Sequence, residues 1–597
     1  MMIRRSRFLR ASILGLLSGV SAFAALAAPA AGSYVPITPS AATSTVTLTG
    51  HDLTIEQLVQ VARYGAQVQL SAEARQRSAN AYGLLLEAAA EGIPVYWFNR
   101  GSGAGRETVI FAGDPTSAEN RVALGRRQLD IFERGATAGL GPEINEEEVV
   151  RAMMVVRANA MTYEAASPAL TQMLLDLINQ RITPVVQSRG TVGEGDLGPY
   201  SNIGATMVGA GEAYYQGVRM SAAQALASAA LKPLRPFAAD DSALTSSNGY
   251  ATGGAALLLD DARRVLDWAD LAFSIDLDGM NSSITPLALP VQSNRPFKYL
   301  NWDAQRLLSM LKGSYLFQDD EHRIIQDPES MRASSIRTAS AWQAWAQLRA
   351  DVLTQMNSSD HNPAVRVGMS PQDSWELNTP QLLKYYIKGG AHSHGQHGFI
   401  LSNANWDPYP MANDIEAFTL ALANLDVVIA QRINRFTNTF FTLIRPADVL
   451  KPEQLAVASP GSGVGNAAIA AAIFQEIQSF AVPVTPEGNA LIQTVEDLQA
   501  QTRLKITRAH QVVDDSLDLL AEDLLTGTYW LDVRYAQDAT REFGAAPTAA
   551  WNAFRAALPF LSPPRLGSSQ PTHELAAAFL RHNAASGYMG SAAGNPP

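Results

Sequence analysis

The chain has 597 residues and a mass of 64.0 kDa, and 47% of its residues are hydrophobic against 17% charged. This composition excludes a disordered or fibrous chain, because it supplies ample apolar material for a large core. The 45 Lys and Arg against 56 Asp and Glu give a net charge of −11, which disfavours nucleic acid and anionic membrane surfaces as partners and favours a small-molecule ligand.

The first 27 residues have the three parts of a secretory signal peptide. A basic head with four arginines precedes a short apolar stretch, and Ala25-Leu26-Ala27 fits a cleavage site. An uncleaved anchor needs about 20 apolar residues, whereas this stretch is interrupted by Ser18 and Gly19. We therefore predict a signal peptide over 1–27, a linker over 28–50, and a periplasmic or secreted protein without membrane contact after cleavage. The chain has no cysteine, which excludes disulfides and cysteine nucleophiles.

Helical periodicity dominates the rest of the chain. Asn145 and Glu148 have the spacing of a capping box ahead of a helix. Apolar residues from Phe418 to Phe440 keep helical spacing through about six turns. Strand-like alternation is confined to short segments such as 107–112. The sequence therefore predicts an all-α fold built around a bundle of long helices.

Polar and glycine-rich segments interrupt the helices, and we expect the chemistry of the protein there. In the first, Tyr96 precedes Gly101, Gly103 and Gly105, a composition typical of a loop that folds over a ligand. A tyrosine at the base of this loop can accept a proton if cations or dipoles lower its pKa from about 10. Alternatively, the aromatic ring only anchors a mobile loop.

Two further segments can form binding elements. Gly193 and Gly195 flank Glu194 in a glycine-rich stretch over 190–199, which can present an acid or several N–H groups to a cavity, or be a plain turn. Asn248 stands at the entrance to a helix that is expected to start within 251–254. Its amide suits carboxylate recognition or ordinary helix capping.

Arg332 closes a polar segment that also contains Gln326 and Glu329. An arginine can hold a substrate carboxylate through a two-pronged contact that lysine cannot make. A second polar segment follows over 357–363. Together they indicate a carboxylate-binding region in the second half of the chain.

Three histidines lie within six residues, at His392, His394 and His397, with Ser393 between the first two. A metal site is one interpretation of this cluster. However, the chain has no His-Glu-x-x-His pattern there, and Gly395 weakens a preformed ligand geometry. We predict that the protein holds no metal, and keep a metal-dependent enzyme as a third alternative.

Taken in order, these segments resemble the aromatic amino acid lyase superfamily, which contains the histidine and phenylalanine ammonia-lyases. The resemblance runs from about His51 to about Arg534. The segment Tyr96 to Gly103 stands where the family has its Tyr-Gly-x-x-Thr-Gly-x-Gly loop. The other matching segments are Gly211 to Gly217, Asn248-Gly249 (Asn-Gly-Thr), Gln326 to Arg332 (Gln-Asp-x-Tyr-Ser-x-Arg), Asn362-Pro363 (Asp-Asn-Pro), His394 to Gln396 (His-Gly-Gln) and Val495 to Asp497 (Gln-Glu-Asp).

The resemblance implies an all-α protein with a long central helical bundle and a smaller N-terminal lid region. It divides the chain into an N-terminal lyase region over 51–240, the bundle over 241–535 and a C-terminal extension over 536–597. It also implies a homotetramer whose active sites combine residues of several subunits. In such a site Tyr96 is the catalytic base, Glu496 tunes or orients the cavity, and the substrate is bound by Asn248, Gln326, Glu329, Arg332, Ser393 and His394.

The main departure from the family lies at Gly193, Glu194 and Gly195. Family ammonia-lyases make an electrophilic methylidene-imidazolone from an internal Ala-Ser-Gly, whereas this loop is one residue shorter and has Glu194 at the serine. Because glutamate cannot lose water to give the methylidene, we predict that these residues are a remnant of the cofactor site and that the cofactor is absent. Ala136, Glu329 and Ser393 also replace a histidine, a tyrosine and an aromatic residue of the family.

This combination is similar to ergothionase, a superfamily member that lacks the electrophile and eliminates trimethylamine from a betaine. A quaternary ammonium leaves without prior activation once the neighbouring carbon is deprotonated, and Glu194 and Glu329 can favour its positive charge. We therefore expect an exported carbon–nitrogen lyase that acts on an amino-acid-like substrate. The alternatives are a non-catalytic amino-acid or betaine binding protein, the metal-dependent enzyme above, and an ordinary ammonia-lyase with a different electrophile.

Overall fold

The computed structural model describes residues 34–135, 137–191, 193–457, 465–485, 488, 490–493, 495–560 and 572–597. The predicted signal peptide, the first part of the predicted linker and Ala136 lie outside the described residues. Among the helices that the structure describes, none has the length and apolarity that crossing a membrane requires.

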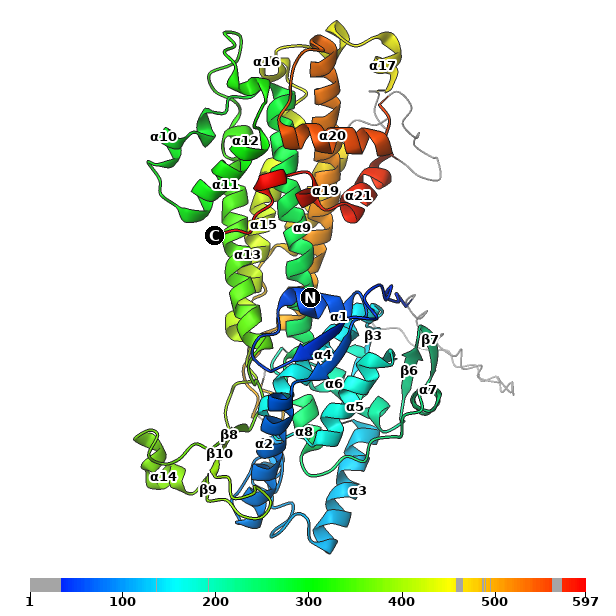
Figure 1. Cartoon of the computed structure of the whole chain (residues 1–597), viewed down its shortest axis with the longest axis vertical. Helices are drawn as coiled ribbons and strands as arrows, with labels where there is room; N and C mark the ends of the chain where they lie inside the picture. The colour runs from blue at the N-terminus through cyan, green and yellow to red at the C-terminus, as the bar shows by residue number, and fades with distance from the viewer. Residues whose placement is uncertain are drawn as a thin grey trace, which may run out of the picture.

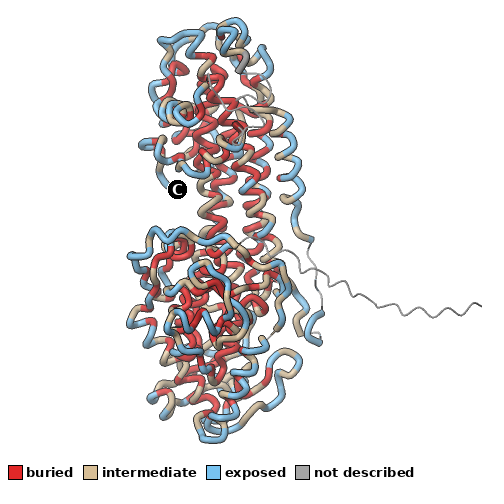
Figure 2. The backbone as a smooth tube through the Cα atoms, turned by 90° about the vertical axis from the view of Figure 1, so that its right-hand side faces the viewer, coloured by how far each residue is buried: buried red, intermediate tan, exposed pale blue. Residues whose placement is uncertain are grey.

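Long helices form a bundle in the upper part of the molecule (Figure 1). They are α9 (Gly249–Met280), α13 (Ser334–Met356), α15 (Tyr409–Arg435) and α19 (Thr502–Gln537). Helix α19 packs against α9 and α15, and α13 packs against α15 and α9. The sides that face one another are buried, while the outer sides of the molecule are exposed (Figure 2). The predicted all-α bundle is confirmed.

Helix α15 carries the predicted apolar stripe. Phe418, Leu422 and Ile429 are fully buried, and Phe436 forms the C-cap. Phe440 does not belong to the stripe, because Asn438 accepts a hydrogen bond from its N–H and caps the separate helix α16 (Thr439–Thr442). Phe440 is 67% exposed as a result.

The N-terminal lobe covers the lower end of α9 (Figure 1). Its helices are α1 (Ile55–Ala62), α2 (Ala72–Ala90), α3 (Ala118–Arg134), α4 (Glu147–Ala160), α5 (Pro168–Asn179), α6 (Leu197–Met207), α7 (Ala222–Ser228) and α8 (Asp240–Thr245). Its strands are β1 (Thr45–Leu48), β2 (Gln67–Leu70), β3 (Leu140–Glu143), β4 (Ile182–Pro184), β5 (Gln187–Arg189), β6 (Glu212–Tyr215) and β7 (Val218–Ser221). β1 and β2 pair in parallel with Val46 opposite Val68, β3 pairs with β5, and β6 lies between β4 and β7.

Two local predictions in this lobe are wrong. The expected capping box is absent, because α4 begins at Glu147 and has no side-chain cap. Instead, the N–H of Glu147 donates to the carbonyl of Val35, at 3.0 Å, so a distant segment supplies the cap. The segment 107–112 forms no strand and makes only one bridge, between Val109 and Arg100.

Smaller elements surround the far end of the bundle and form a side lobe. Toward the far end lie α10 (Leu289–Gln292), α11 (Lys298–Met310), α12 (Glu329–Arg332), α16, α17 (Pro452–Val457), α20 (Ala545–Ala557) and α21 (Thr572–His582). Helix α18 (Ala467–Phe480) runs alongside α19 and α15. The side lobe, at the lower left of Figure 1, contains β8 (Ala364–Val367), α14 (Pro380–Leu383), β9 (Tyr386–Ile387) and β10 (Gly398–Leu401), with β10 between β8 and β9. Short 3-10 turns cover Gly103–Gly105, Met161–Tyr163, Thr285–Leu287, Tyr315–Phe317, Glu376–Asn378, Pro446–Asp448, Ala585–Gly587 and Gly590–Ala592.

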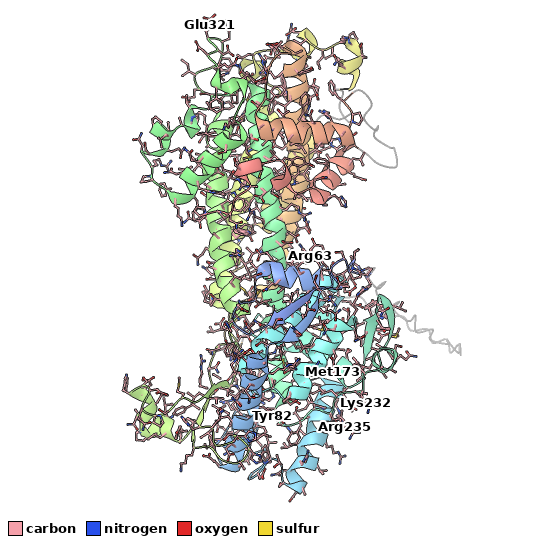
Figure 3. The ribbon with its side chains drawn as sticks, viewed as in Figure 1. Arg63, Tyr82, Met173, Lys232, Arg235 and Glu321 are labelled. Atoms are coloured by element: carbon pink, nitrogen blue, oxygen red, sulfur yellow. The ribbon has the colours of Figure 1, made fainter. Side chains whose placement is uncertain are left out.

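Helix α9 separates two groups of predicted site residues, one beside its lower end and one beside its upper end. Its 32 residues span about 48 Å at 1.5 Å per residue. Asn248 precedes its lower end, while the segment with Arg332 is tied to its upper end, where Ser283 N–H donates to Asp327 at 2.8 Å. In Figure 3, Tyr82 of the N-terminal lobe and Glu321 of the segment that precedes Arg332 lie at opposite ends of the molecule.

Candidate active site

A cavity of about 500 Å³ lies beside the lower end of α9. Several segments of the chain line the cavity. The glycine-rich loop contributes Tyr96 and Trp97, and the loop over 190–199 contributes Glu194. The segments before α15 and α19 contribute Trp406 and Glu496. The structure therefore brings together three predicted site residues that lie 400 positions apart at the extremes, Tyr96, Glu194 and Glu496.

Tyr96 sits at the base of the glycine-rich loop, as predicted. Its hydroxyl accepts a hydrogen bond from the N–H of Gly103 at 3.2 Å, and its ring meets Trp97 edge to face, with the centroids 6.1 Å apart. Burial raises the pKa of Tyr96, and the carboxylate of Glu496 raises it further, while the Gly103 N–H and Arg106 oppose the shift. The expected lowering of this pKa is thus not produced by the residues of a single chain.

The loop that carries Glu194 depends on its two flanking glycines. Gly193 and Gly195 have φ of 90° and 89°, a region that favours glycine. A Cβ on Gly193 would lie 2.4 Å from the backbone nitrogen of Thr502. The hydroxyl of Thr502 also donates to the Gly193 carbonyl at 3.2 Å, which fastens the loop to the start of α19.

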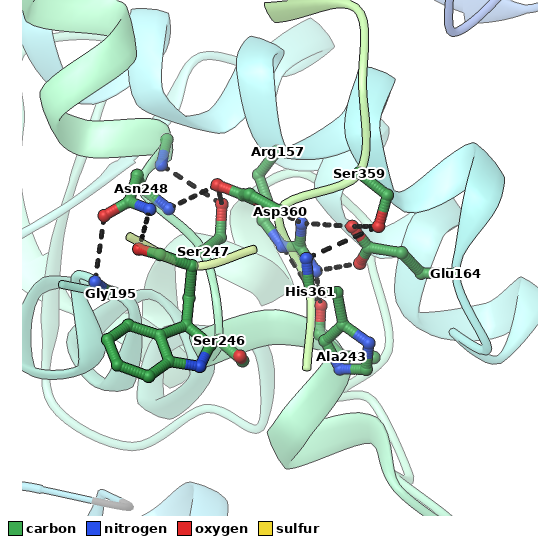
Figure 4. Close-up of polar contacts among 12 residues, drawn as sticks. Arg157, Glu164, Gly195, Ala243, Ser246, Ser247, Asn248, Ser359, Asp360 and His361 are labelled. Carbon is green, nitrogen blue, oxygen red and sulfur yellow. Dashed lines mark hydrogen bonds and ion pairs between the residues drawn. The ribbon is translucent and has the colours of Figure 1, made fainter. Parts of the chain in front are cut away.

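Asn248 holds this loop from the other side (Figure 4). Its side chain is fully buried, accepts the N–H of Gly195 at 2.9 Å, and donates to the carbonyl of Trp406. Its backbone N–H donates to Asp360 at 2.6 Å. Both groups of the amide are therefore engaged within the chain, and Asn248 positions two walls of the cavity. That it also contacts a substrate carboxylate stays a prediction.

A buried ion-pair network supports Asn248 from behind (Figure 4). Asp360 also accepts from the hydroxyl of Ser247 at 3.1 Å and lies 3.7 Å from the guanidinium of Arg157. Arg157 pairs in turn with Glu164, and both side chains are almost fully buried. Sequence reasoning singled out the segment 357–363 but not Asp360, whose partners lie more than 100 residues away.

The cavity is strongly acidic. Both carboxylate oxygens of Glu194 are buried and have no hydrogen-bond partner among the described residues. Burial raises the pKa of Glu194 to about 8, and Asp407, Glu496 and Asp497 add to the shift. Burial and Asp497 also raise the pKa of Glu496. In the part of the chain that the structure describes, no lysine, arginine or histidine lines the cavity.

The residues at the loop do not fit the methylidene-imidazolone that the resemblance implies. Glu194 stands where the resemblance puts the serine and offers no hydroxyl that could be lost as water, and its carboxylate has no hydrogen-bond partner among the described residues. An alanine at position 193 would collide with Thr502. The backbone of this loop therefore fits Gly-Glu-Gly, and the absence of the cofactor stays a prediction.

The other predicted site residues lie away from this cavity within one chain. Gln326 and Glu329 are exposed at the far end of the bundle, and Arg332 is half-buried there, with its Nε donating to the carbonyl of Asp327 at 2.8 Å. Both terminal nitrogens of Arg332 have no hydrogen-bond partner among the described residues. These residues can complete a site only if another subunit brings them to it.

The histidine segment belongs to the side lobe and does not line the cavity. Ser393 is buried and accepts the N–H of Gly390 at 3.1 Å, while His394 is exposed. His392 contacts Asp114 at 3.1 Å, and His397 packs on Tyr386. Among the described residues no three side chains are arranged to hold a metal ion.

Comparison with known proteins places this geometry in a family. The model of the family "Aromatic amino acid lyase" matches residues 53–556. Histidine ammonia-lyase 2 of Fusobacterium nucleatum is 25% identical over 488 residues, covering 80% of this chain and 86% of that protein. Histidine ammonia-lyase of Sorangium cellulosum is 29% identical over 505 residues, covering 82% and 89%.

Solved structures show the same fold. Ergothionase from Treponema denticola, solved with desmethyl-ergothioneine sulfonic acid, has a TM-score of 0.74 at 23% identity and covers 90% of this chain and 99% of that one. Histidine ammonia-lyase from Trypanosoma cruzi has a TM-score of 0.74 at 20% identity and covers 92% and 95%. The chain therefore belongs to the aromatic amino acid lyase family.

Proposed function

We propose that this protein is a carbon–nitrogen lyase that works without methylidene-imidazolone and eliminates an amine from an amino-acid-like substrate. The candidate that we put first is trimethylamine release from a betaine such as ergothioneine. The observation that carries this proposal is the cavity itself, which Tyr96 lines together with Glu194, whose carboxyl has no hydrogen-bond partner among the described residues and which stands where the resemblance puts the cofactor serine.

The reaction needs a base and a leaving group that requires no activation. Tyr96 Oη would remove a proton from the carbon next to the one that bears nitrogen. The electron pair of that C–H bond forms a carbon–carbon double bond, and the C–N bond breaks with its electrons leaving on the neutral amine. A quaternary nitrogen already carries the positive charge that makes this departure favourable.

A cationic substrate would also lower the raised pKa of Tyr96. Burial and Glu496 stabilise the neutral phenol of Tyr96. A positive charge bound beside Tyr96 would favour the phenolate, because opposite charges a few ångströms apart lower the pKa of an acid. The substrate would thus help to activate its own base, and a neutral analogue would not.

A homotetramer would complete the site. Arg332 lies in the segment tied to the upper end of α9, a helix about 48 Å long whose lower end adjoins the cavity. Its terminal nitrogens have no hydrogen-bond partner among the described residues and suit a carboxylate. We propose that Arg332, with Gln326 and Glu329, reaches the cavity of another subunit. We also propose that the protein is exported after cleavage behind Ala27, which N-terminal sequencing of the periplasmic fraction would test.

The test is product formation from a panel of betaines and amino acids that includes ergothioneine and histidine. We expect trimethylamine and the ultraviolet absorbance of an unsaturated acid, and we expect Tyr96→Phe to lose at least about 100-fold in kcat, the usual contribution of a general base. Tyr64→Phe, at a tyrosine that is 38% exposed, is the matched control and should retain activity. Ammonia release would contradict the electrophile-free reaction.

A non-catalytic amino-acid or betaine binding protein is the second candidate. The raised pKa of Tyr96 favours it, since a neutral phenol is a poor base. Saturable binding of a panel compound without any product would establish this alternative and exclude the lyase.

A further inference from the structure

We infer that the cavity binds its ligand as an organic cation, and that Glu194 gives up a proton when the cation enters. The inference rests on the proposed function for the identity of the substrate as a betaine, but the cation site itself depends only on the geometry of the cavity. It makes Glu194 the residue that determines specificity for charge.

The first step is the state of Glu194. Its two oxygens are buried, lack hydrogen-bond partners among the described residues and belong to a residue that lines the cavity. A buried carboxylate without a partner is costly, so below about pH 8 the group stays neutral until a partner arrives. The groups that face it are Glu496 and Asp497 from the segment before α19, and Asp407 from the segment before α15, all of them acids.

The second step is the absence of a resident counter-ion. Within the described chain no basic side chain lines the cavity. Arg106, which lowers the pKa of Tyr96, lies on the Tyr96 loop and is not among the groups that shift the pKa of Glu194. Within one chain, the charge that would ionise Glu194 therefore comes with the ligand. Arg332, the cation that we propose another subunit contributes, would be engaged by the ligand's carboxylate.

The third step is the aromatic wall. Tyr96, Trp97 and Trp406 line the same cavity as Glu194. The indole N–H of Trp97 donates to Asp241 at 2.9 Å, and that of Trp406 donates to the carbonyl of Asn403 at 3.2 Å. Because both N–H groups are bonded elsewhere, the two indoles offer ring surface and no donors. Ring surface beside carboxylates is the environment that a quaternary ammonium prefers.

The two charges of a betaine then match the proposed site. Its ammonium would lie against Glu194 and the aromatic rings, and its carboxylate would lie against Arg332 of another subunit. Glu194 would ionise on binding, so that one proton leaves to solvent for each cation bound. Below the pKa of the empty site, affinity should therefore rise with pH.

Isothermal titration of the purified protein with choline tests the inference, with 3,3-dimethylbutanol as a probe of the same shape but no charge. We expect choline to bind at least about 10-fold more tightly than the alcohol. With Glu194 ionising near pH 8 in the empty cavity, choline affinity should rise roughly 20-fold from pH 6.5 to pH 8.5. At pH 6.5, titrations in buffers of different ionisation enthalpy should report about one proton released.

Two variants test whether the released proton comes from Glu194. Glu194→Gln should weaken choline binding at pH 8.5 and abolish both the pH dependence and the proton release. Glu574→Gln, at an exposed glutamate of α21, should behave as wild type. The inference is overturned if choline does not bind, if it binds no better than the alcohol, or if Glu194→Gln leaves affinity and its pH dependence unchanged.

The outcomes separate this inference from the proposed function. Choline binding with proton release, but no amine from any panel compound, would keep the cation site and remove the lyase. Trimethylamine release with the same KM and pH profile in wild type and Glu194→Gln would keep the lyase and remove the role of Glu194.

Discussion

Asn248→Ala is the substitution that most directly tests how the cavity is built. The fully buried amide makes one hydrogen bond to Gly195 and one to Trp406. Alanine removes both and leaves the buried N–H of Gly195 and the half-buried carbonyl of Trp406 unpaired, which should cost about 2 to 4 kcal/mol. If the loop and Trp406 must hold their positions in the transition state, kcat/KM should fall roughly 30- to 900-fold.

The assay for this variant is amine release, with choline titration as a readout that does not depend on catalysis. Asn179→Ala is the matched control, because this amide also makes two backbone hydrogen bonds, at 2.8 and 2.9 Å to Val68, outside the cavity. Both variants should melt at lower temperature than wild type. Only Asn248→Ala should lose activity and choline affinity, and equal activity of the two variants would refute the positioning role.

Three further outcomes are expected. Mixing subunits of inactive Tyr96→Phe and Arg332→Ala should restore part of the activity, because some sites then receive both intact residues; no recovery after co-expression would contradict the shared site. Burial raises the pKa of Asp278 to about 7, whereas the same carboxyl ionises at lower pH in the unfolded chain. The free energy of unfolding of wild type should therefore fall by about 3 kcal/mol between pH 5 and pH 8, relative to that of Asp278→Asn. An equal change of melting temperature in both proteins between the two pH values would count against this. Gly193→Ala should lower the melting temperature and the activity together, given its φ of 90° and the 2.4 Å approach, and wild-type behaviour would show that the loop can shift.

The sequence predicts the bundle well, because its helices bury regular apolar stripes. Phe418 to Phe436 fall on one buried face, as the spacing requires. Helix ends are predicted less well when the partner is distant. Asn145 has the right spacing for a cap, but the carbonyl of Val35 takes the N–H of Glu147 instead, and no local pattern announces that contact.

The site residues are likewise predictable where a local pattern marks them and unpredictable where a distant partner decides their role. Tyr96, Glu194 and Glu496 stand out in sequence because glycines and family motifs surround them, and the structure places all three at one cavity. Trp406 and Asp360 carry no such signal, because their roles depend on bonds to Asn248 that close loops of more than 100 residues. The direction of the Tyr96 pKa also could not be read locally, since burial and the distant Glu496 set it.

The close packing of Gly193 on Thr502 also bears on how this protein can change its chemistry. A single Glu194→Ser substitution would supply the missing hydroxyl but still leave the loop one residue short and glycine at position 193. Adding a methyl group there means pushing back the start of a 36-residue helix whose inner face is part of the bundle core. Forming the electrophile from this chain would therefore require changes in the helical scaffold as well as in the loop. Laboratory evolution toward ammonia release would need coordinated changes in the loop and in α19.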